Sequence, residues 1–182
     1  MTWKNSKTKY GAASIGLHWL MLLLLAAVYA CMELRGIFPK GSALRDGMKN
    51  WHYMLGLSVF GLTWLRLALQ LSGVTPDIKP PAPRSQMRLA AFMKIALYAL
   101  MIGMPLLGWM LLSAEAKSIP FFGLQLPALI GADKALAKQI KEVHELFGTV
   151  GYFLIGLHAA AGLYHHYIVR DNTLRRMLPG QN

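Results

Sequence analysis

Four long apolar runs divide the chain, and polar segments rich in charge separate them. Each run is near or above the ~20 residues that an α-helix needs to cross about 30 Å of hydrocarbon. The pattern therefore predicts an all-α membrane protein, a four-helix transmembrane bundle formed by one domain over residues 1–182. The expected spans are residues 14–34, 52–71, 89–113 and 143–169.

Two other stretches need a separate interpretation. Residues 119–130 are apolar but too short to cross, and they contain Pro120, Gly123 and Pro127, so we expect an interfacial loop lying on the membrane. The first span follows three lysines, as in a signal peptide. It is too long for one, however, and the following "MELRGIFPKGS" has no cleavage pattern of small residues, so we expect it to remain as a helix.

Composition supports a membrane location. Of the 182 residues, 55% are hydrophobic and 15% are charged, too few polar residues to cover a soluble globule. The net charge of +11 arises from basic residues that flank the apolar runs, which indicates contact with membrane lipid and no nucleic acid. The two tails and the 72–88 loop, with the adjoining span residues, hold eleven Lys and Arg against two acids. The other two loops hold eight against six, so both termini are expected in the cytoplasm.

Four histidines fall at matching depths in this topology. His18 and His158 lie in the inner half of the membrane, whereas His52 and His144 open their helices at the outer face. His158 follows His144 by fourteen residues, which places it roughly 21 Å further along the helix and within ~40° of the same face. The stripe between them contains glycines 148 and 151, and Gly162 continues it. This stripe suits a flat recess for a planar ligand, although close helix packing would also explain it.

Imidazoles in hydrocarbon are costly unless their nitrogens are used. Two histidines at one depth, on different helices, can hold a haem iron from both sides, so the two pairs predict two haems. Isolated core histidines and zinc are the alternatives, but no carboxylate or thiolate lies at the right depth to complete a tetrahedral zinc site. His165 and His166 are expected to lie at the inner interface with Tyr164 and Tyr167, outside the ligand set.

Two cations lie within the predicted spans. Arg66 follows His52 by fourteen residues and so shares its face at the depth of the inner pair. Arg66 could contact an anionic haem propionate, or its side chain could extend to the lipid headgroups of the inner leaflet; both alternatives stay open. Lys94, in the third span, offers the same two possibilities.

Several segments together resemble the bacterial cytochrome b561 family. They include "SIGLHWLMLLL", "WHYMLGLSVFGLTWLRL", "VHELFGTVGYFLIGLHAAAGLYHHY" and "RDNTLRRMLP", and the likeness covers almost the whole chain. The resemblance implies a multi-pass protein of the bacterial inner membrane with two haem b groups, which exchanges electrons with quinone. It also implies that the haem-ligating histidines are His18, His52, His144 and His158. Where many relatives carry a histidine on the third helix, this chain has Lys94 in "KIALY".

The branch that the chain resembles most implies a superoxide:quinone oxidoreductase that oxidises superoxide at the periplasmic side and reduces ubiquinone. Arg35, Lys40, Arg45 and Lys49 would then form a cationic mouth beside His52 that attracts the anion, unless they are ordinary solvated charges. Two other functions stay open. One is a cytochrome b anchor subunit that passes electrons from a partner dehydrogenase or hydrogenase to quinone, and the other is a non-redox membrane protein with a histidine proton relay.

Overall fold

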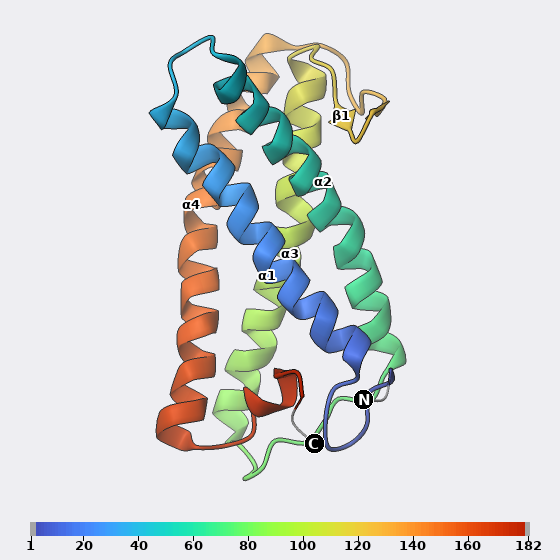
Figure 1. Cartoon of the computed structure of the whole chain (residues 1–182), viewed down its shortest axis with the longest axis vertical. Helices are drawn as coiled ribbons and strands as arrows, with labels where there is room; N and C mark the ends of the chain where they lie inside the picture. The colour runs from blue at the N-terminus through green and yellow to red at the C-terminus, as the bar shows by residue number, and fades with distance from the viewer. Residues whose placement is uncertain (1–2, 181–182) are drawn as a thin grey trace. The chain divides into compact units, whose positions relative to one another are not determined.

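The computed structural model describes residues 3–180, and within them four long helices dominate (Figure 1). Each is long and apolar enough to cross a membrane, which confirms the predicted all-α transmembrane fold class. The cytoplasmic location of both termini stays a prediction. Residues 1–2 and 181–182, at the two ends of the chain, lie outside the described residues. The helices are α1 (Ala12–Leu34), α2 (Ala43–Ser72), α3 (Arg84–Ala114) and α4 (Lys134–Tyr164).

Two helices begin nine residues earlier than the apolar pattern predicts, at 43 instead of 52 and at 134 instead of 143. Side chains that cap the helix starts explain the difference. The Asp133 carboxylate accepts hydrogen bonds from the amides of Ala135 and Leu136 at 2.9 and 3.0 Å, and Ser42 Oγ accepts one from the Arg45 amide at 3.3 Å. Hydropathy marks only the part of a helix that lipid surrounds, and the polar first turns extend beyond it.

The chain packs as two compact units, and each unit takes a segment from all four helices. Unit 1 contains the residues up to Leu20, Thr63–Ala99 and the residues from Val150, whereas unit 2 contains Met21–Leu62 and Leu100–Thr149. His18 and His158 therefore belong to unit 1, and His52 and His144 belong to unit 2. The single domain expected over residues 1–182 stays a prediction.

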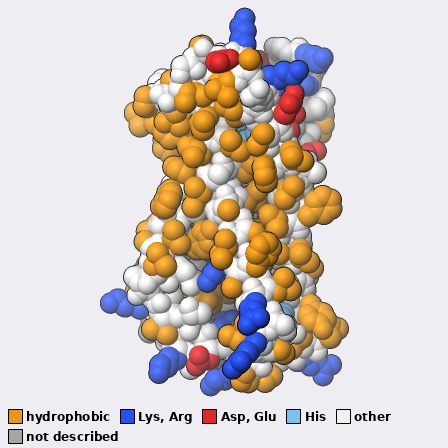
Figure 2. All heavy atoms as spheres, turned by 180° about the vertical axis from the view of Figure 1, so that it is seen from behind, with side chains coloured by type: hydrophobic (Ala, Val, Ile, Leu, Met, Phe, Trp, Pro, Cys, Tyr) orange, Lys and Arg blue, Asp and Glu red, His pale blue; other side chains and the backbone are white. Residues whose placement is uncertain are grey.

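The outward faces of the helices are apolar. Figure 2 shows hydrophobic side chains over the middle of the visible face, whereas most of the visible Lys and Arg side chains lie towards the helix ends. Leu23, Phe92 and Phe153 expose 68%, 65% and 74% of their surface, while Thr63 is fully buried. Exposing apolar side chains to water costs free energy, whereas contact with lipid tails does not, so this surface suits a bilayer.

The segment predicted as an interfacial loop is instead a β-hairpin in unit 2. Strands β1 (Pro120–Phe121) and β2 (Leu124–Gln125) pair in antiparallel fashion across a turn formed by Phe122 and Gly123. Both turn residues have positive φ (46° and 87°), as a tight hairpin turn requires. Ile119, just before β1, is 2% exposed and packs with Leu57 and Leu112, which fixes the hairpin to the helices.

Candidate functional site

The predicted histidine pair of unit 2 is brought together by α2 and α4. The ring centres of His52 and His144 lie 6.2 Å apart, with their planes at 74°. Nδ1 of His52 is 3.0 Å from the backbone carbonyl of Val28 on α1. A carbonyl oxygen only accepts, so Nδ1 carries the proton and Nε2 keeps its lone pair, the tautomer typical of a metal-ligating histidine.

The predicted pair of unit 1 has the same separation. The ring centres of His18 on α1 and His158 on α4 are also 6.2 Å apart, and their planes lie at 78°. His18 is half-buried, whereas His158 is exposed. The sequence-based pairing by depth therefore agrees with which rings lie opposite each other in each unit.

The ring centres of both pairs lie 6.2 Å apart, and this distance can be compared with the spacing expected for two kinds of contact. A direct N–H···N hydrogen bond of about 2.9 Å would bring the ring centres to roughly 5.1 Å. Two metal–nitrogen bonds of about 2.0–2.1 Å, with each nitrogen about 1.1 Å from its ring centre, give roughly 6.3 Å. The separation of each pair leaves room for one metal ion between the two rings, but the distance by itself is not specific, since the neighbouring rings of His52 and Tyr53 also lie 6.2 Å apart.

The donor set fits haem iron better than a bare metal ion. Among residues 3–180, no group of three or more His, Cys, Asp or Glu is placed to hold a metal. Zinc requires at least three protein ligands, and each pair supplies only two. Haem iron receives four nitrogens from its own macrocycle and two axial ligands from the protein, so two opposed histidines are sufficient.

Neighbouring helices brace the unit 2 pair. The Tyr29 hydroxyl donates to the Gly148 carbonyl at 2.9 Å, one turn after His144, and Tyr29 directly follows the Val28 that holds His52. Gly108 on α3 gives the His144 ring its space, because a Cβ at that position would lie 3.4 Å from His144 Cε1. His144 Nδ1 is buried beside the backbone of Met104, with no hydrogen bond of ordinary geometry to any of residues 3–180.

The glycine stripe on α4 only partly forms the expected recess. A Cβ at Gly162 would meet no atom within 4 Å, whereas one at Gly148 would make an ordinary contact of 3.8 Å with Met104 Cε. Gly151 is buried. Helix packing therefore accounts for part of the stripe, the alternative noted in the sequence.

The two cations predicted near the inner pair differ in placement. Arg66 on α2 lies close enough to His18 and His158 for its charge to act on both rings. It forms no ion pair with any residue in the described part of the chain. Lys94 is exposed on α3 and likewise has no ion pair within residues 3–180. The structure thus places Arg66, and not Lys94, electrostatically beside the pair.

His165 and His166 follow α4 in a π-helical turn, His165–Val169. They contact Tyr164 and Tyr167 as expected, at ring-centre distances of 6.0 and 4.8 Å. The sequence analysis missed a further partner, since His165 Nδ1 lies 2.6 Å from Oδ2 of Asp171, whose surface is 2% exposed. Burial alone would raise the pKa of this carboxyl. Hydrogen bonds from the Thr173 amide and His165 outweigh burial and lower the pKa of Asp171, so it stays ionised.

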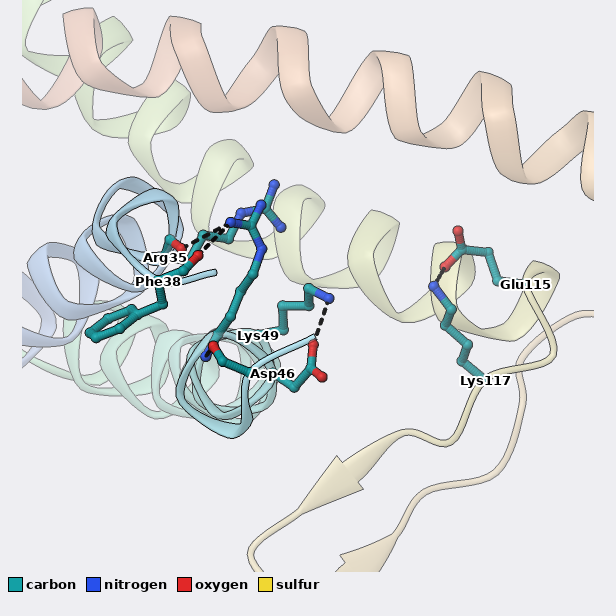
Figure 3. A network of polar contacts seen from close by, with 8 residues as sticks. Arg35, Phe38, Asp46, Lys49, Glu115 and Lys117 are labelled. Carbon is teal, nitrogen blue, oxygen red and sulfur yellow. Dashed lines mark hydrogen bonds and ion pairs between the residues drawn. The ribbon is translucent and has the colours of Figure 1, made fainter. Parts of the chain in front are cut away.

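The predicted cationic mouth is smaller than the sequence suggests (Figure 3). Arg45 Nη1 donates to the carbonyls of Arg35 and Phe38 at 3.3 and 2.9 Å, so Arg45 holds the loop in place. Lys49 is paired with Asp46 at 2.9 Å. Lys40 is exposed, and the Arg35 charge acts on His52. Two of the four cations are therefore engaged within the loop, and Arg35 and Lys40 remain to attract an anion.

Comparisons with known proteins agree on one family. The family model of prokaryotic cytochrome b561 matches residues 9–180. Cytochrome b561 homolog 1 of Escherichia coli (strain K12) is 42% identical over 171 residues, which cover 94% of this chain and 97% of the relative. The probable superoxide oxidase CybB of Yersinia pestis is 38% identical over 171 residues, with 94% and 96% covered. Cytochrome b561 homolog 2 of E. coli is 27% identical over 183 positions, with 98% and 95% covered.

The contact between Gly108 and His144 makes a first prediction. Gly108→Ala would place a methyl group 3.4 Å from His144 Cε1, at the limit of ordinary contact, so crowding of the ring should offset the roughly 0.5–1 kcal/mol that alanine gains over glycine in a helix. Thermal unfolding of the purified protein in detergent measures the change in stability. Gly103→Ala, on the same helix and with open space around its Cβ, is the matched control and should stabilise the protein by about 0.5–1 kcal/mol, because alanine favours a helix more than glycine. Equal melting temperatures for the two variants would contradict the proposed packing role of Gly108.

Proposed function

The chain belongs to the prokaryotic cytochrome b561 family, and from this premise we propose that it is a di-haem superoxide:ubiquinone oxidoreductase. Superoxide is the donor at the periplasmic side, and ubiquinone is the acceptor. The balanced reaction takes one electron from each of two superoxide ions, releases two O2, and adds two electrons and two protons to one quinone to form quinol.

Family membership carries the broader part of this conclusion. It confirms the resemblance seen in the sequence and makes the chain a multi-pass electron-transfer protein of the inner membrane that uses haem b. An oxidoreductase role in general follows from the same membership together with the name of the Yersinia relative. The number of haems, the donor and the acceptor belong to the proposal.

The observation that best supports two haems is that two histidine pairs, each drawn from two different helices, are brought into ring contact. In the proposal, His52 and His144 are the axial ligands in unit 2, and His18 and His158 are those in unit 1. Val28 sets the tautomer of His52, and Arg66, whose charge acts on His18, would bind a propionate of the haem held in unit 1. Lys94 is a second candidate for a propionate. A bis-histidine haem supplies one-electron transfer with no open coordination position, so oxygen chemistry at the metal is not expected.

The direction of electron flow rests on topology and charge. The excess of Lys and Arg in the tails and the 72–88 loop supports a cytoplasmic location for these segments and a periplasmic location for the loop that carries Arg35 and Lys40. Arg35 and Lys40 in unit 2 then face the compartment where superoxide would be captured, and their charge raises its local concentration.

One experiment tests the function. The purified protein is supplied with superoxide and ubiquinone, and quinol formation is followed with and without superoxide dismutase. We expect quinol formation that superoxide dismutase abolishes. A red protein that superoxide does not reduce would instead indicate an anchor subunit fed by a partner dehydrogenase or hydrogenase. A colourless protein would reject haem and favour a histidine proton relay.

The ligand assignment predicts distinct losses. A pyridine haemochrome assay should give two non-covalent haems per chain, since the single cysteine cannot form the two thioether links of a c-type attachment. His52→Ala or His144→Ala should remove one haem, and His18→Ala or His158→Ala should remove the other. His165→Ala and His166→Ala, the matched controls, should each retain both. Loss of a haem in His165→Ala but not in His158→Ala would show that the wrong residue on α4 was chosen.

The angles between the paired rings make a spectroscopic prediction. The low-spin EPR signal of a bis-imidazole iron depends on the angle between the two ligand planes. Planes at 74° and 78° are close to perpendicular, so both oxidised haems should give strongly anisotropic low-spin signals. EPR of the oxidised protein at liquid-helium temperature measures this. A rhombic signal typical of parallel imidazole planes would contradict the ring orientations.

Charge neutralisation tests the capture of superoxide. Arg35→Gln combined with Lys40→Gln should slow superoxide-dependent haem reduction by about two- to tenfold at low ionic strength. The loss should shrink at 0.15 M salt, where screening acts over about 8 Å. Reduction by dithionite should be unchanged. Lys49→Gln, a cation already paired with Asp46, is the control and should have a smaller effect. An unchanged rate in the double variant at low salt would reject steering but leave the di-haem assignment intact.

A further inference from the structure

The segment after α4 folds back on unit 1, and we call residues 170–178 the C-terminal hook. The chain leaves the helical turn at Arg170, whose φ of 59° is left-handed. The Asp171 amide then donates to the His165 carbonyl at 3.1 Å, and the Asp171 carboxylate accepts from His165 Nδ1 and from the Thr173 amide at 2.6 and 2.7 Å. These bonds determine where the hook turns away from α4.

The hook is then locked to the loop between α2 and α3. Asn172 forms three hydrogen bonds to this loop. Its amide donates to the Lys79 carbonyl at 3.2 Å, its Oδ1 accepts from the Lys79 amide at 2.8 Å, and its Nδ2 donates to the Asp77 carbonyl at 3.1 Å. Arg176 adds a bond to the Pro76 carbonyl and stacks its guanidinium 5.8 Å from the Tyr10 ring centre.

The far end of the hook reaches a residue beside a histidine of the unit 1 pair. The Trp19 Nε1–H donates to the Met177 carbonyl at 2.7 Å. Figure 1 shows the C-terminal segment close to the start of α1. The Trp19 ring lies edge-on to His18, with ring centres 5.4 Å apart and planes at 69°. A continuous chain of contacts thus runs from Asn172 through Met177 and Trp19 to His18.

We propose that the C-terminal hook is part of the unit 1 haem site, in which Met177 fixes the Trp19 indole and Trp19 in turn sets the plane of the His18 ring. This inference rests on the proposed function, because it takes His18 as an axial ligand. An axial imidazole has one free rotation, about its bond to the metal, and neighbouring side chains decide that angle. His52 in unit 2 has its angle set by the Val28 carbonyl. No hydrogen bond from the described residues holds His18, so its flanking indole takes that role. Trp19 is therefore a positioning residue, and the hook positions Trp19.

The test uses the purified full-length protein with its haems and reads the low-spin EPR signal of each haem. Trp19→Phe keeps an aromatic ring but removes the N–H that Met177 accepts. Asn172→Ala removes two of the bonds that lock the hook, far from His18 in sequence. We expect both variants to keep two haems per chain and to shift the g values of the signal that His18→Ala abolishes. The other signal should be unchanged, and it reports that the rest of the protein is folded.

Two matched controls accompany these variants. Trp51→Phe changes a tryptophan that precedes His52 and packs against Phe122, and Asn50→Ala changes an exposed asparagine within α2. Neither should move the unit 1 signal. If Asn172→Ala does not accumulate, Asn172→Asp replaces it, since it keeps the acceptor for Lys79 and loses only the donor to Asp77.

The possible outcomes distinguish failure of the hook proposal from failure of the proposed di-haem function. Unchanged g values in both variants would overturn the proposal, and so would a shift in Trp19→Phe alone, which would mean that Trp19 acts without the hook. A wild-type protein with no haem signal would overturn the proposed function itself. Equal shifts of both signals in Asn172→Ala would point to general loosening of the protein and would also overturn the proposal.

Discussion

An imidazole inside an apolar helix bundle has two nitrogens, and the rest of this structure depends on how each nitrogen is used. A buried nitrogen with no partner costs free energy, and lipid offers it no hydrogen bond. In unit 2, the Val28 carbonyl accepts a hydrogen bond from Nδ1 of His52, which leaves the lone pair of Nε2 unused by that bond, and the His52 ring contacts the His144 ring. The helices are thus packed so that a backbone carbonyl of α1 reaches one face of the pair while α3 gives the His144 ring its space at Gly108.

The four spans and the two histidine pairs could be predicted from the sequence because both depend on regular helix geometry. Hydropathy locates the lipid-embedded part of a helix, and 1.5 Å of rise per residue then sets the depth of every histidine in it. The polar first turns of α2 and α4 could not be predicted in this way, because Ser42 and Asp133 cap turns that lie beyond the apolar runs. Hydropathy also did not predict the β-hairpin. Two residues of positive φ and one buried isoleucine determine its conformation, and its average hydropathy does not.

Charged side chains were the least predictable part of the site. The sequence shows four cations before and beside His52, yet it does not show that Arg45 binds the carbonyls of Arg35 and Phe38 or that Lys49 pairs with Asp46. Asp171 was counted only as one acid among basic residues of the inner side. Its contact with His165 depends on a left-handed residue at 170 that turns the chain back. Such pairings follow from loop conformation, for which a single sequence has no periodic signal.

The two histidine pairs are braced by different kinds of group, and this difference has consequences for how each can change. Val28 holds His52 through a backbone carbonyl, so substitution of the Val28 side chain leaves the bond in place and the unit 2 pair tolerates sequence change at that point. Trp19 beside His18 depends on its own side chain and on a hook that Asn172 and Arg176 hold. The unit 1 pair therefore depends on more side chains, several of them outside the helices. If each pair holds a haem as proposed, differences between relatives in haem environment should arise first in unit 1, because side chains vary by mutation and a helix backbone does not.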